Sequence, residues 1–137
     1  MKKEFLFLIC LITAAAVLLA ACNPVRPITA NQFTAAAAEA GFQTRTHGEW
    51  RVAEKYDGEI IIDFIVMATV EDAISLFEQN DVIPGGERIS GKNFIHSRIE
   101  TETEYRVLSR IENTVLKARS ALEFIDELES FLNTIGY

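Results

Sequence analysis

The sequence predicts an α+β domain with a single antiparallel β-sheet of about five to six strands covered by two to three helices, in the order α-β-β-β-α-β-β-β-α. Consecutive strand patterns are joined by connections of hairpin length, which favour antiparallel pairing. Amphipathic helix patterns stand at the beginning, middle and end of the folded region and need a sheet face to cover. One β-branched run, residues 59–67, is apolar on both faces and suits a central strand.

The first helix is expected to follow Thr29 and to end near Ala40. Thr29 and Gln32 have the spacing of a capping box, in which each side chain bonds the backbone N–H of the other residue. The alanine-rich run between these ends propagates a helix well. Gly41 provides a C-terminal stop.

Strand patterns follow over 43–46 and 50–56, with a turn at His47-Gly48 between them. Asp57-Gly58 is a two-residue hairpin signal that leads into the 59–67 run. These three strands are therefore expected to pair in sequence order.

The middle helix is expected to start at a second capping box, Thr69-Val70-Glu71-Asp72, and to run to about Gln79. Its apolar positions form one stripe toward the core, namely Val70, Ala73, Ile74 and Phe77. The following stretch, residues 80–91, contains Pro84-Gly85-Gly86 and is expected to be a loop.

Three further strands are expected over 92–98, 102–109 and 114–118, with Glu112-Asn113 as the tight connection between the last two. Ser120-Ala121-Leu122-Glu123 has the form of a third capping box, which predicts the start of the final helix. That helix carries a strong apolar stripe and ends at Gly136.

The charge balance excludes one class of partner. The chain has 13 basic and 20 acidic residues, a net charge of −7, and removal of Lys2, Lys3 and Glu4 with an export signal would make it −8. Nucleic acid binding needs a basic surface that neutralises phosphates, so no nucleic-acid partner is expected. Both cysteines, Cys10 and Cys22, precede the folded region, so the domain has no thiol for a disulfide or a metal.

The first 22 residues have the layout of an export signal. A basic start, Lys2-Lys3, precedes an uncharged stretch from Phe5 to Ala21. The stretch leads into Leu19-Ala20-Ala21-Cys22, which resembles the lipobox of bacterial lipoproteins. The resemblance implies that the Cys22 sulfur carries a diacylglycerol thioether and that signal peptidase cuts between Ala21 and Cys22.

Two other interpretations of this segment are open. An uncleaved membrane span over these uncharged residues would be roughly 26 Å long as a helix, short of the roughly 30 Å hydrocarbon core. A plain secreted protein would carry the cysteine by coincidence. The lipobox matches at all four positions, so the lipoprotein interpretation is preferred. Residues 1–21 are then the signal peptide and 29–137 one α+β domain.

A lipid on Cys22 would make the membrane the first partner of this protein. Residues 22–28 contain Pro24 and Pro27 and are expected to form the lipidated cysteine and a short extended tether, with a reach on the order of 20 Å. The expected location is the extracytoplasmic side of the cell membrane, or the outer membrane in a host with two membranes. An envelope protein or a small ligand is expected as the further partner.

No catalytic constellation is visible in the sequence. His47 and His96 are the two histidines, and no Gly-x-Ser-x-Gly elbow accompanies them. Pro84-Gly85-Gly86-Glu87 is not followed by the Lys-Ser or Lys-Thr pair of a phosphate-binding loop. No catalytic residue, metal-ligand set or cofactor is therefore expected.

Glu100, Glu102 and Glu104 alternate in an acidic run and are candidates for binding a hard cation. In a strand they would share one face at about 6.8 Å per step. No Asp/Asn/Gly loop of the calcium-binding type accompanies them. A solvated strand face or a hairpin end, with Arg98 and Arg106 beside the glutamates, is the preferred interpretation.

Asp63 is a further candidate because it interrupts the most apolar strand. Burial of a bare carboxylate costs several kcal/mol unless it is paired. A functional acid with a raised pKa is one explanation. The preferred explanations are that its face is partly exposed, or that an arginine such as Arg51 pairs with it across the strands.

The whole pattern resembles a set of small lipoproteins from Firmicutes. The likeness rests on the lipobox, on Ile28-Thr29-Ala30, on Ser109-Arg110-Ile111-Glu112-Asn113-Thr114 and on the terminal Ile135-Gly136-Tyr137. In those proteins the terminal Gly-Tyr usually follows leucine, whereas here it follows isoleucine. The resemblance implies location and architecture, namely an early helix after a short tether and a final strand-turn-strand before a helix. It implies no activity.

Two functional hypotheses follow. The preferred one is a non-enzymatic binding or interaction module of the cell envelope, because a lipid anchor and a short tether accompany no catalytic set. The alternative is an envelope enzyme that uses carboxylates, with Asp63 and a glutamate of the 100–104 run as candidates.

Overall fold

A computed structural model describes residues 25–81 and 85–137 of the chain. These residues form helices on a β-sheet, in the order α2 (Ala30–Glu39), β1 (Gln43–His47), β2 (Trp50–Lys55), β3 (Ile60–Val66), α3 (Val70–Asn80), β4 (Glu87–Ser90), β5 (Phe94–Glu100), β6 (Glu104–Ile111), β7 (Thr114–Ala121), the 3₁₀ turn η1 (Leu122–Phe124) and α4 (Ile125–Ile135).

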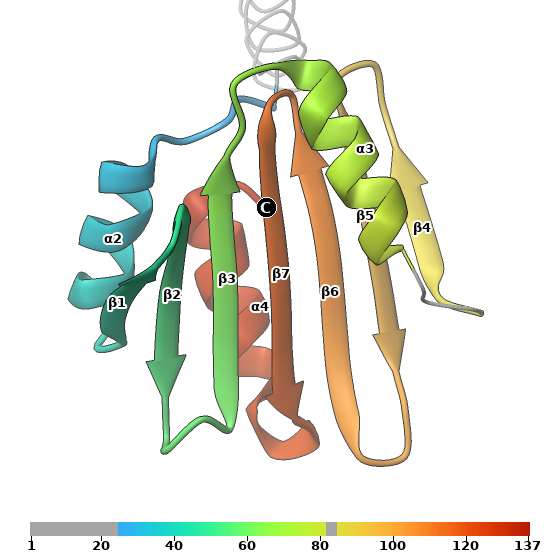
Figure 1. The fold of residues 1–137 in the computed structure, drawn as a ribbon. Coiled ribbons are helices and arrows are strands. Elements are labelled where there is room, and N and C mark those ends of the chain that lie inside the picture. Colours follow the sequence, from blue (N-terminus) through green and yellow to red (C-terminus); the bar gives the residue numbers. More distant parts are fainter. Residues whose placement is uncertain (1–24, 82–84) are drawn as a thin grey trace, which may run out of the picture.

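All seven of these strands join one antiparallel sheet in the order β1-β2-β3-β7-β6-β5-β4 (Figure 1). Two series of hairpins, β1 to β3 and β4 to β7, each pair in sequence order. The two series meet where β3 pairs with β7, from Ile60 opposite Ser120 to Val66 opposite Thr114. The α+β class and the single antiparallel sheet are confirmed, but the sheet has seven strands where five to six were expected.

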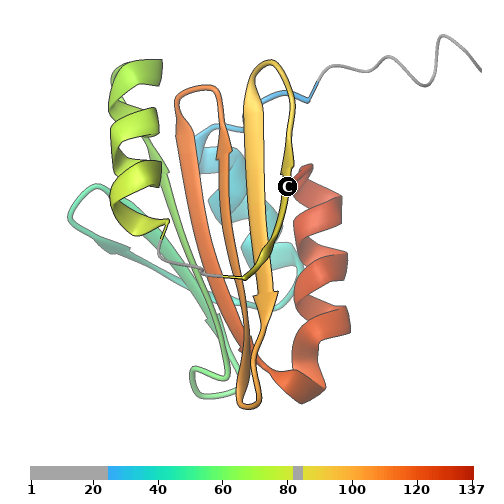
Figure 2. The same cartoon turned by 90° about the vertical axis from the view of Figure 1, so that its right-hand side faces the viewer.

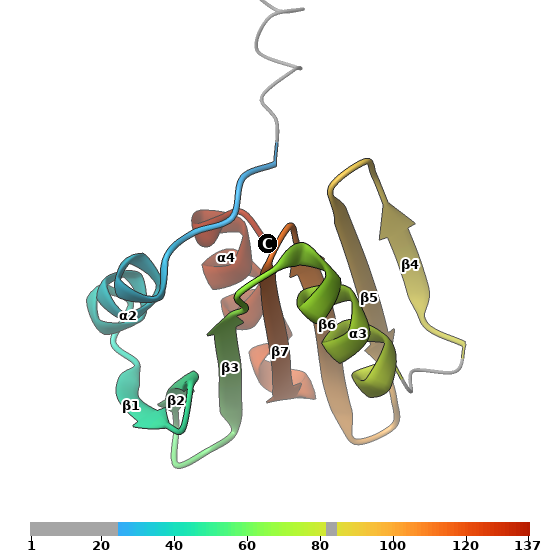
Figure 3. The ribbon, with the colours of Figure 1, turned by 45° about the horizontal axis from the view of Figure 1, so that its top comes forward.

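The helices cover the two faces of the sheet unequally (Figures 2 and 3). Helices α2 and α4 pack on one face, which we call the covered face. Helix α3 lies on the opposite face, which we call the α3 face. In Figure 1 the α3 face is toward the viewer, and α3 spans only the upper part of the sheet. None of the described helices lies on the lower part of the α3 face (Figure 1).

The main hydrophobic core lies on the covered face. Ile60, Ile62 and Phe64 alternate along β3 and are fully buried against Phe33 of α2 and Leu132 of α4. The rings of Phe33 and Phe64 stack with their centroids 4.8 Å apart. Because a large apolar side chain contributes about 1.5–3 kcal/mol when fully buried, this face provides most of the hydrophobic stabilisation.

A smaller core lies beneath α3. Ala73 and Phe77 of the helix pack on Ile65, Leu108 and Val115, which come from three neighbouring strands. The expected stripe of this helix is therefore confirmed in its centre. The other two residues of the stripe are exposed to solvent, Val70 at 40% and Ile74 at 37%.

The first two helices begin where the capping signals predict. The Gln32 N–H donates to Thr29 Oγ1 at 3.2 Å and the Thr29 N–H donates to Gln32 Oε1 at 2.8 Å, so the first capping box is complete. At α3 the Asp72 N–H donates to Thr69 Oγ1 at 3.1 Å. Each cap satisfies an N–H that has no partner inside the helix.

The third expected capping box is wrong. Ser120 lies inside β7, and the Ala121 N–H donates to the carbonyl of Glu59 at 3.0 Å. A 3₁₀ turn then precedes α4, which begins at Ile125 without a side-chain cap. Pairing with β3 and β6 extends the strand through residues whose local pattern favours a helix start.

The stretch expected as a loop, residues 80–91, contains β4. All four side chains of Glu87–Ser90 are exposed, and the strand is held at the sheet edge by its pairing with β5. An exposed edge strand needs no apolar alternation, so its sequence carries no strand pattern. The tight connection at Glu112-Asn113 is confirmed, and Glu112 has the positive φ of 47° that such a turn requires.

The described part of the expected tether, residues 25–28, lies against the domain. Val25 and Ile28 are partly buried against the main core. The Asn93 side chain donates from Nδ2 to the carbonyl of Val25 at 2.8 Å. This segment is therefore docked, whereas a free spacer was expected.

Candidate functional site

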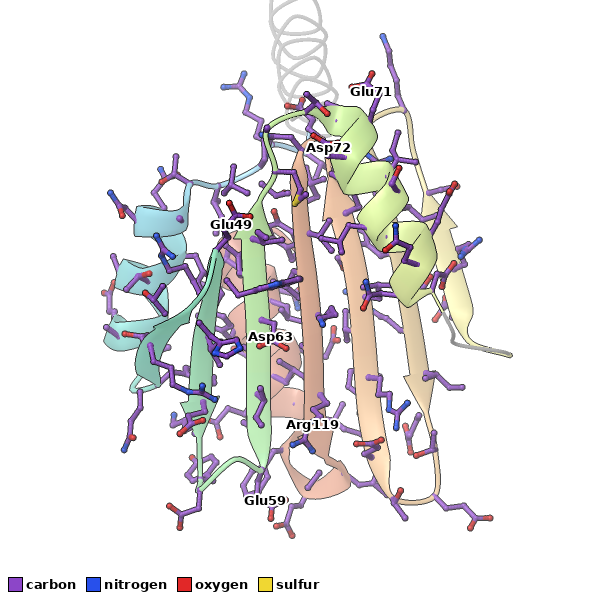
Figure 4. All side chains as sticks on the ribbon, in the orientation of Figure 1. Glu49, Glu59, Asp63, Glu71, Asp72 and Arg119 are labelled. Atoms are coloured by element: carbon purple, nitrogen blue, oxygen red, sulfur yellow. The ribbon has the colours of Figure 1, made fainter. Side chains whose placement is uncertain are left out.

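The uncovered part of the α3 face holds a hollow of about 220 Å³ beside the last turn of α3. Strands β3, β7 and β6 form its floor, and Asn80 of α3 stands at its rim. The side chains that reach it from the strands are Ile61, Asp63, Arg106, Leu108, Lys117 and Arg119. Asp63 and Arg119 are labelled on this face in Figure 4. We call this set, with Asn80, the strand hollow.

The register of the strands brings these side chains together. Asp63 lies opposite Lys117, and Ile61 lies opposite Arg119, across β3 and β7. Arg106 lies opposite Arg119 across β6 and β7. Residues directly opposite on antiparallel strands share a face, with Cβ atoms about 4.5–5.5 Å apart. Positions far apart in sequence therefore form one continuous surface.

Two arginines directly opposite one another destabilise a sheet unless an anion offsets them. Here Glu104 does so, because its carboxylate accepts a hydrogen bond from Arg106 Nε at 2.6 Å and lies 4.0 Å from Arg119 Nη1. Both arginines stay more than half exposed. Their guanidinium groups thus remain available to a ligand from solvent.

Lys117 is positioned by an aromatic ring. Its ammonium lies 4.6 Å from the ring centre of Trp50, a cation–π contact that holds the side chain over the sheet. With Arg106 and Arg119 it provides three cations, against the carboxylates of Asp63 and Glu104. The surface therefore gathers basic charge in a chain whose net charge is −7, which favours a ligand with an anionic group.

Asp63 is half-buried on this face, so the expectation of a partly exposed carboxylate is confirmed. The expected ion pair with Arg51 is wrong, because Arg51 lies opposite Phe64 and thus points to the covered face. Within residues 25–81 and 85–137, Asp63 forms no ion pair within 4.0 Å. Its carboxylate is thus a free acceptor within the strand hollow.

The three candidate glutamates do not share a strand face. Glu100 ends β5, Glu104 begins β6, and Glu102 lies in the turn between them, so the hairpin-end interpretation is confirmed. Glu104 forms an ion pair with Arg106. Arg98 instead lies on the covered face, where it approaches Glu129 of α4 at 3.4 Å.

The alternative hypothesis of a carboxylate enzyme needs two acids near one cleft. Glu100 lies opposite Tyr105 and points to the covered face, away from Asp63. Glu104 shares the face of Asp63, but it lies four residues further along β7 and two strands away. Strand spacings place the two backbones about 16 Å apart, whereas paired catalytic carboxylates lie about 5–10 Å apart. The structure does not bring these candidates together.

One serine–histidine contact was not visible in the sequence pattern. His96 Nδ1 lies 2.8 Å from Ser109 Oγ across β5 and β6. Ser109 is fully buried on the covered face, so its hydroxyl cannot reach a substrate. Burial, together with the nearby charge of Arg98, lowers the pKa of His96. The contact is a structural hydrogen bond. The other histidine, His47, is exposed at the end of β1.

Two larger hollows, each about 450 Å³, lie elsewhere. One separates α2 from α4 and is lined by small and apolar residues with two carboxylates, Glu39 and Glu127. The other lies between the docked segment and the ends of β3 and β7. Neither contains the cluster of cations found in the strand hollow. In the part of the chain that the structure describes, no three His, Cys, Asp or Glu residues are grouped to hold a metal ion.

Four polar residues of the strand hollow were not predicted from the sequence to belong to one site, namely Asn80, Arg106, Lys117 and Arg119. Each occupies an ordinary polar position in its own segment. The alternation of Lys117 and Arg119 in β7 was the available signal, because such residues share a face. Their meeting with Asp63 depends on the β3–β7 pairing, which local patterns do not specify.

Comparisons with protein-family models, with curated proteins and with solved structures found no significant match to this chain. The expected signal peptide, the expected cleavage site at Ala21 and the expected lipidation of Cys22 lie outside the described residues. Among the helices that are described, none combines the length and the apolar character needed to cross a membrane.

Proposed function

We propose that this protein is a lipid-anchored, extracytoplasmic binding module of the cell envelope, and that it holds its ligand in the strand hollow. The observation that carries the proposal is the part of the α3 face that α3 does not cover. There Asp63, Lys117 and Arg119 project from adjacent strands around an open hollow. An antiparallel sheet can leave one face open to solvent, and a group of basic side chains on such a face attracts a ligand with an anionic group.

The anchor rests on the first 22 residues. The lipobox Leu19-Ala20-Ala21-Cys22 supports a lipid on Cys22. Two acyl chains at about 0.8 kcal/mol per buried methylene hold a protein stably on a membrane. The domain beyond it contains no second cysteine, and its core of apolar side chains needs no disulfide.

Binding is preferred over catalysis because the strand hollow offers charge and a rigid floor but no paired acid and base. Its acid, Asp63, faces Lys117, and no histidine, cysteine or serine lines the hollow among the described residues. Three cations against the carboxylates of Asp63 and Glu104 leave an excess of positive charge, which fits a ligand that presents an acidic group and a hydrogen-bond donor. Such a ligand is a small carboxylate, or the acidic segment of an envelope protein.

The test is site-specific photo-cross-linking in living cells with the lipidated protein. A photoreactive amino acid replaces Arg119, which is 54% exposed in the hollow. The matched control places it at Asn133, which is exposed on α4 at the opposite side of the sheet. We expect an adduct from position 119 that is absent from position 133 and that disappears in a Cys22→Ala chain.

A small ligand is sought in parallel by native mass spectrometry of the protein released gently from membranes. The Lys117→Ala change should remove a bound small anion, or reduce the yield of the cross-linked adduct at position 119 about tenfold or more. A loss of that size is typical of one desolvated charge contact. Equal adducts at positions 119 and 133, together with no bound small molecule, would rule the strand hollow out as the binding site.

A further inference from the structure

The point at which the chain leaves the domain is fixed. Val25 is held by the 2.8 Å hydrogen bond from Asn93, which lies in the turn between β4 and β5. The Glu112 N–H in turn donates to the Asn93 carbonyl at 2.8 Å, so the β6–β7 turn is tied to the same place. Figure 3 shows the described chain starting beside these turns, at one end of the sheet. We call this end the anchor end.

Few residues separate the proposed lipid from this fixed point. Cys22 precedes Val25 by three residues, and three residues span at most about 11 Å. A free tether over residues 22–28 would reach roughly twice as far. The docked segment thus brings the anchor end close to any bilayer that holds the lipid of Cys22.

Exposed apolar side chains gather at the same end. Val66 at the end of β3 is 41% exposed and lines a hollow together with Pro27 and Ile28 of the docked segment. Val70 at the start of α3 is 40% exposed. The connection between them is fastened, because Asn113 Nδ2 donates to the carbonyl of Met67 at 2.8 Å.

The surrounding charges are of both signs. Glu71 and Asp72 stand at the start of α3, as labelled in Figure 4. Arg26 is exposed within the docked segment, and Lys92 is exposed in the β4–β5 turn. This balance does not draw the end to anionic lipid by charge. Apolar contact at the interface is the attraction that the side chains offer.

We propose that the anchor end lies on the membrane surface, with Val66 and Val70 in contact with the lipid interface. The inference rests on the proposed lipidation of Cys22. It adds an orientation, because a domain fastened at Val25 and resting on its apolar end stands with its strands running away from the bilayer.

The orientation sets the height of the strand hollow. Lys117 lies three residues along β7 from Thr114 at the anchor end, which is about 10 Å. Together with the short link to the lipid, this places the hollow within about 20 Å of the bilayer surface. The hollow opens sideways, so the ligand is one that is held on, or moves along, the membrane.

The experiment uses the lipidated protein in vesicles of phosphatidylcholine and phosphatidylglycerol at three to one, with some phosphatidylcholine carrying a quencher in its chains. Because the domain has no cysteine after Cys22, a single fluorophore can be attached at Val70→Cys or, as the distal control, at Glu102→Cys. Both positions are exposed, so neither substitution opens the core. Intact mass first establishes the lipid on Cys22.

We expect lipid quenching at position 70 to exceed that at position 102 by about threefold or more, as expected for contact with the interface. Asn93→Ala should reduce the difference by releasing Val25. Equal quenching at the two positions, or stronger quenching at 102, would overturn the orientation even with the lipid present. A mass without lipid would instead remove the proposed anchor, so the two failures are distinguishable.

Discussion

The two faces of the sheet differ in how much of their surface is used for folding. On the covered face, α2 and α4 pack over one core that contains 17 buried residues of the described chain. Four of these are fully buried side chains of the two helices themselves. On the α3 face one helix buries five. The covered face is therefore specialised for stability, and the remainder of the α3 face is left free for contact with a ligand.

Polar groups follow the same division. On the covered face several are bonded to one another, as where the Tyr105 hydroxyl donates to Glu129 Oε1 at 2.7 Å, whereas the buried Arg98 Nε and Ser120 Oγ have no hydrogen-bond partner among the described residues. On the α3 face Lys117 and Arg119 keep their charges at the surface. Substitutions on the two faces should consequently affect different properties, stability on one and binding on the other.

The largest expected effect comes from a matched pair of leucines on neighbouring strands. Leu116→Ala on the covered face should lower the free energy of unfolding by about 4 kcal/mol, and Leu108→Ala under α3 by about 3 kcal/mol. Both are buried, but the neighbours of Leu108 can relax toward the open hollow. Urea unfolding followed by circular dichroism measures both. A larger loss for Leu108→Ala would contradict the inference that the covered face contributes more to stability than the α3 face.

A single hydroxyl should have a smaller effect. Tyr137 packs into the covered-face core and its hydroxyl bonds Thr114 Oγ1, whose own proton goes to the carbonyl of Ile111 at 2.7 Å. Tyr137→Phe should therefore cost about 1 kcal/mol by chemical unfolding at pH 8. No change in the unfolding midpoint would show that this bond does not fasten the C-terminus.

The same tyrosine predicts a loss of stability at alkaline pH. Burial raises the pKa of Tyr137 to about 12, against the opposing effect of its bond with Thr114. Because the ordinary pKa is about 10, the unfolded chain ionises first, and stability falls as the pH rises from 10 toward 12. The fall should be smaller in Tyr137→Phe, with Tyr56→Phe as the control at an exposed tyrosine.

A weaker pH effect is expected from His96 on the acid side. Burial and the nearby Arg98 lower its pKa, so the folded protein holds this ring neutral. As the pH falls below about 6.5 the unfolded state takes up a proton first, and stability decreases. His96→Gln should lose less stability between pH 7 and pH 5 than the parent chain. Identical slopes in thermal unfolding would contradict this role.

The smallest effect on stability should come from the strand hollow. Lys117→Ala with Arg119→Ala should change the free energy of unfolding by no more than about 0.5 kcal/mol, because exposed charges contribute little to stability. Loss of the bound small molecule in native mass spectrometry, without loss of stability, would sharpen the contrast between the faces. A strongly destabilised double variant would mean that this face is needed for folding.

Much of the fold follows from local sequence because its signals act over a few residues. The Thr29 and Thr69 caps, the Glu112-Asn113 turn and the apolar run of β3 each work within one segment, and each lies where it was expected. Signals of the same kind failed where pairing competed with them. The Ser120 pattern favours the start of a helix. However, the pairing of β7 with β3 and β6 continues through Ser120, so this residue belongs to the strand.

The sequence by itself determined the α+β class, the antiparallel hairpins and the acidic charge balance. Only the tertiary structure decided that β3 and β7 are neighbours, which puts Asp63 beside Lys117 and turns Arg51 to the other face. It also decided that α3 covers only part of its face (Figure 1) and that Val25 is docked. The reason is physical: pairing between distant strands and the choice of face depend on burial summed over the whole molecule, which no single segment encodes.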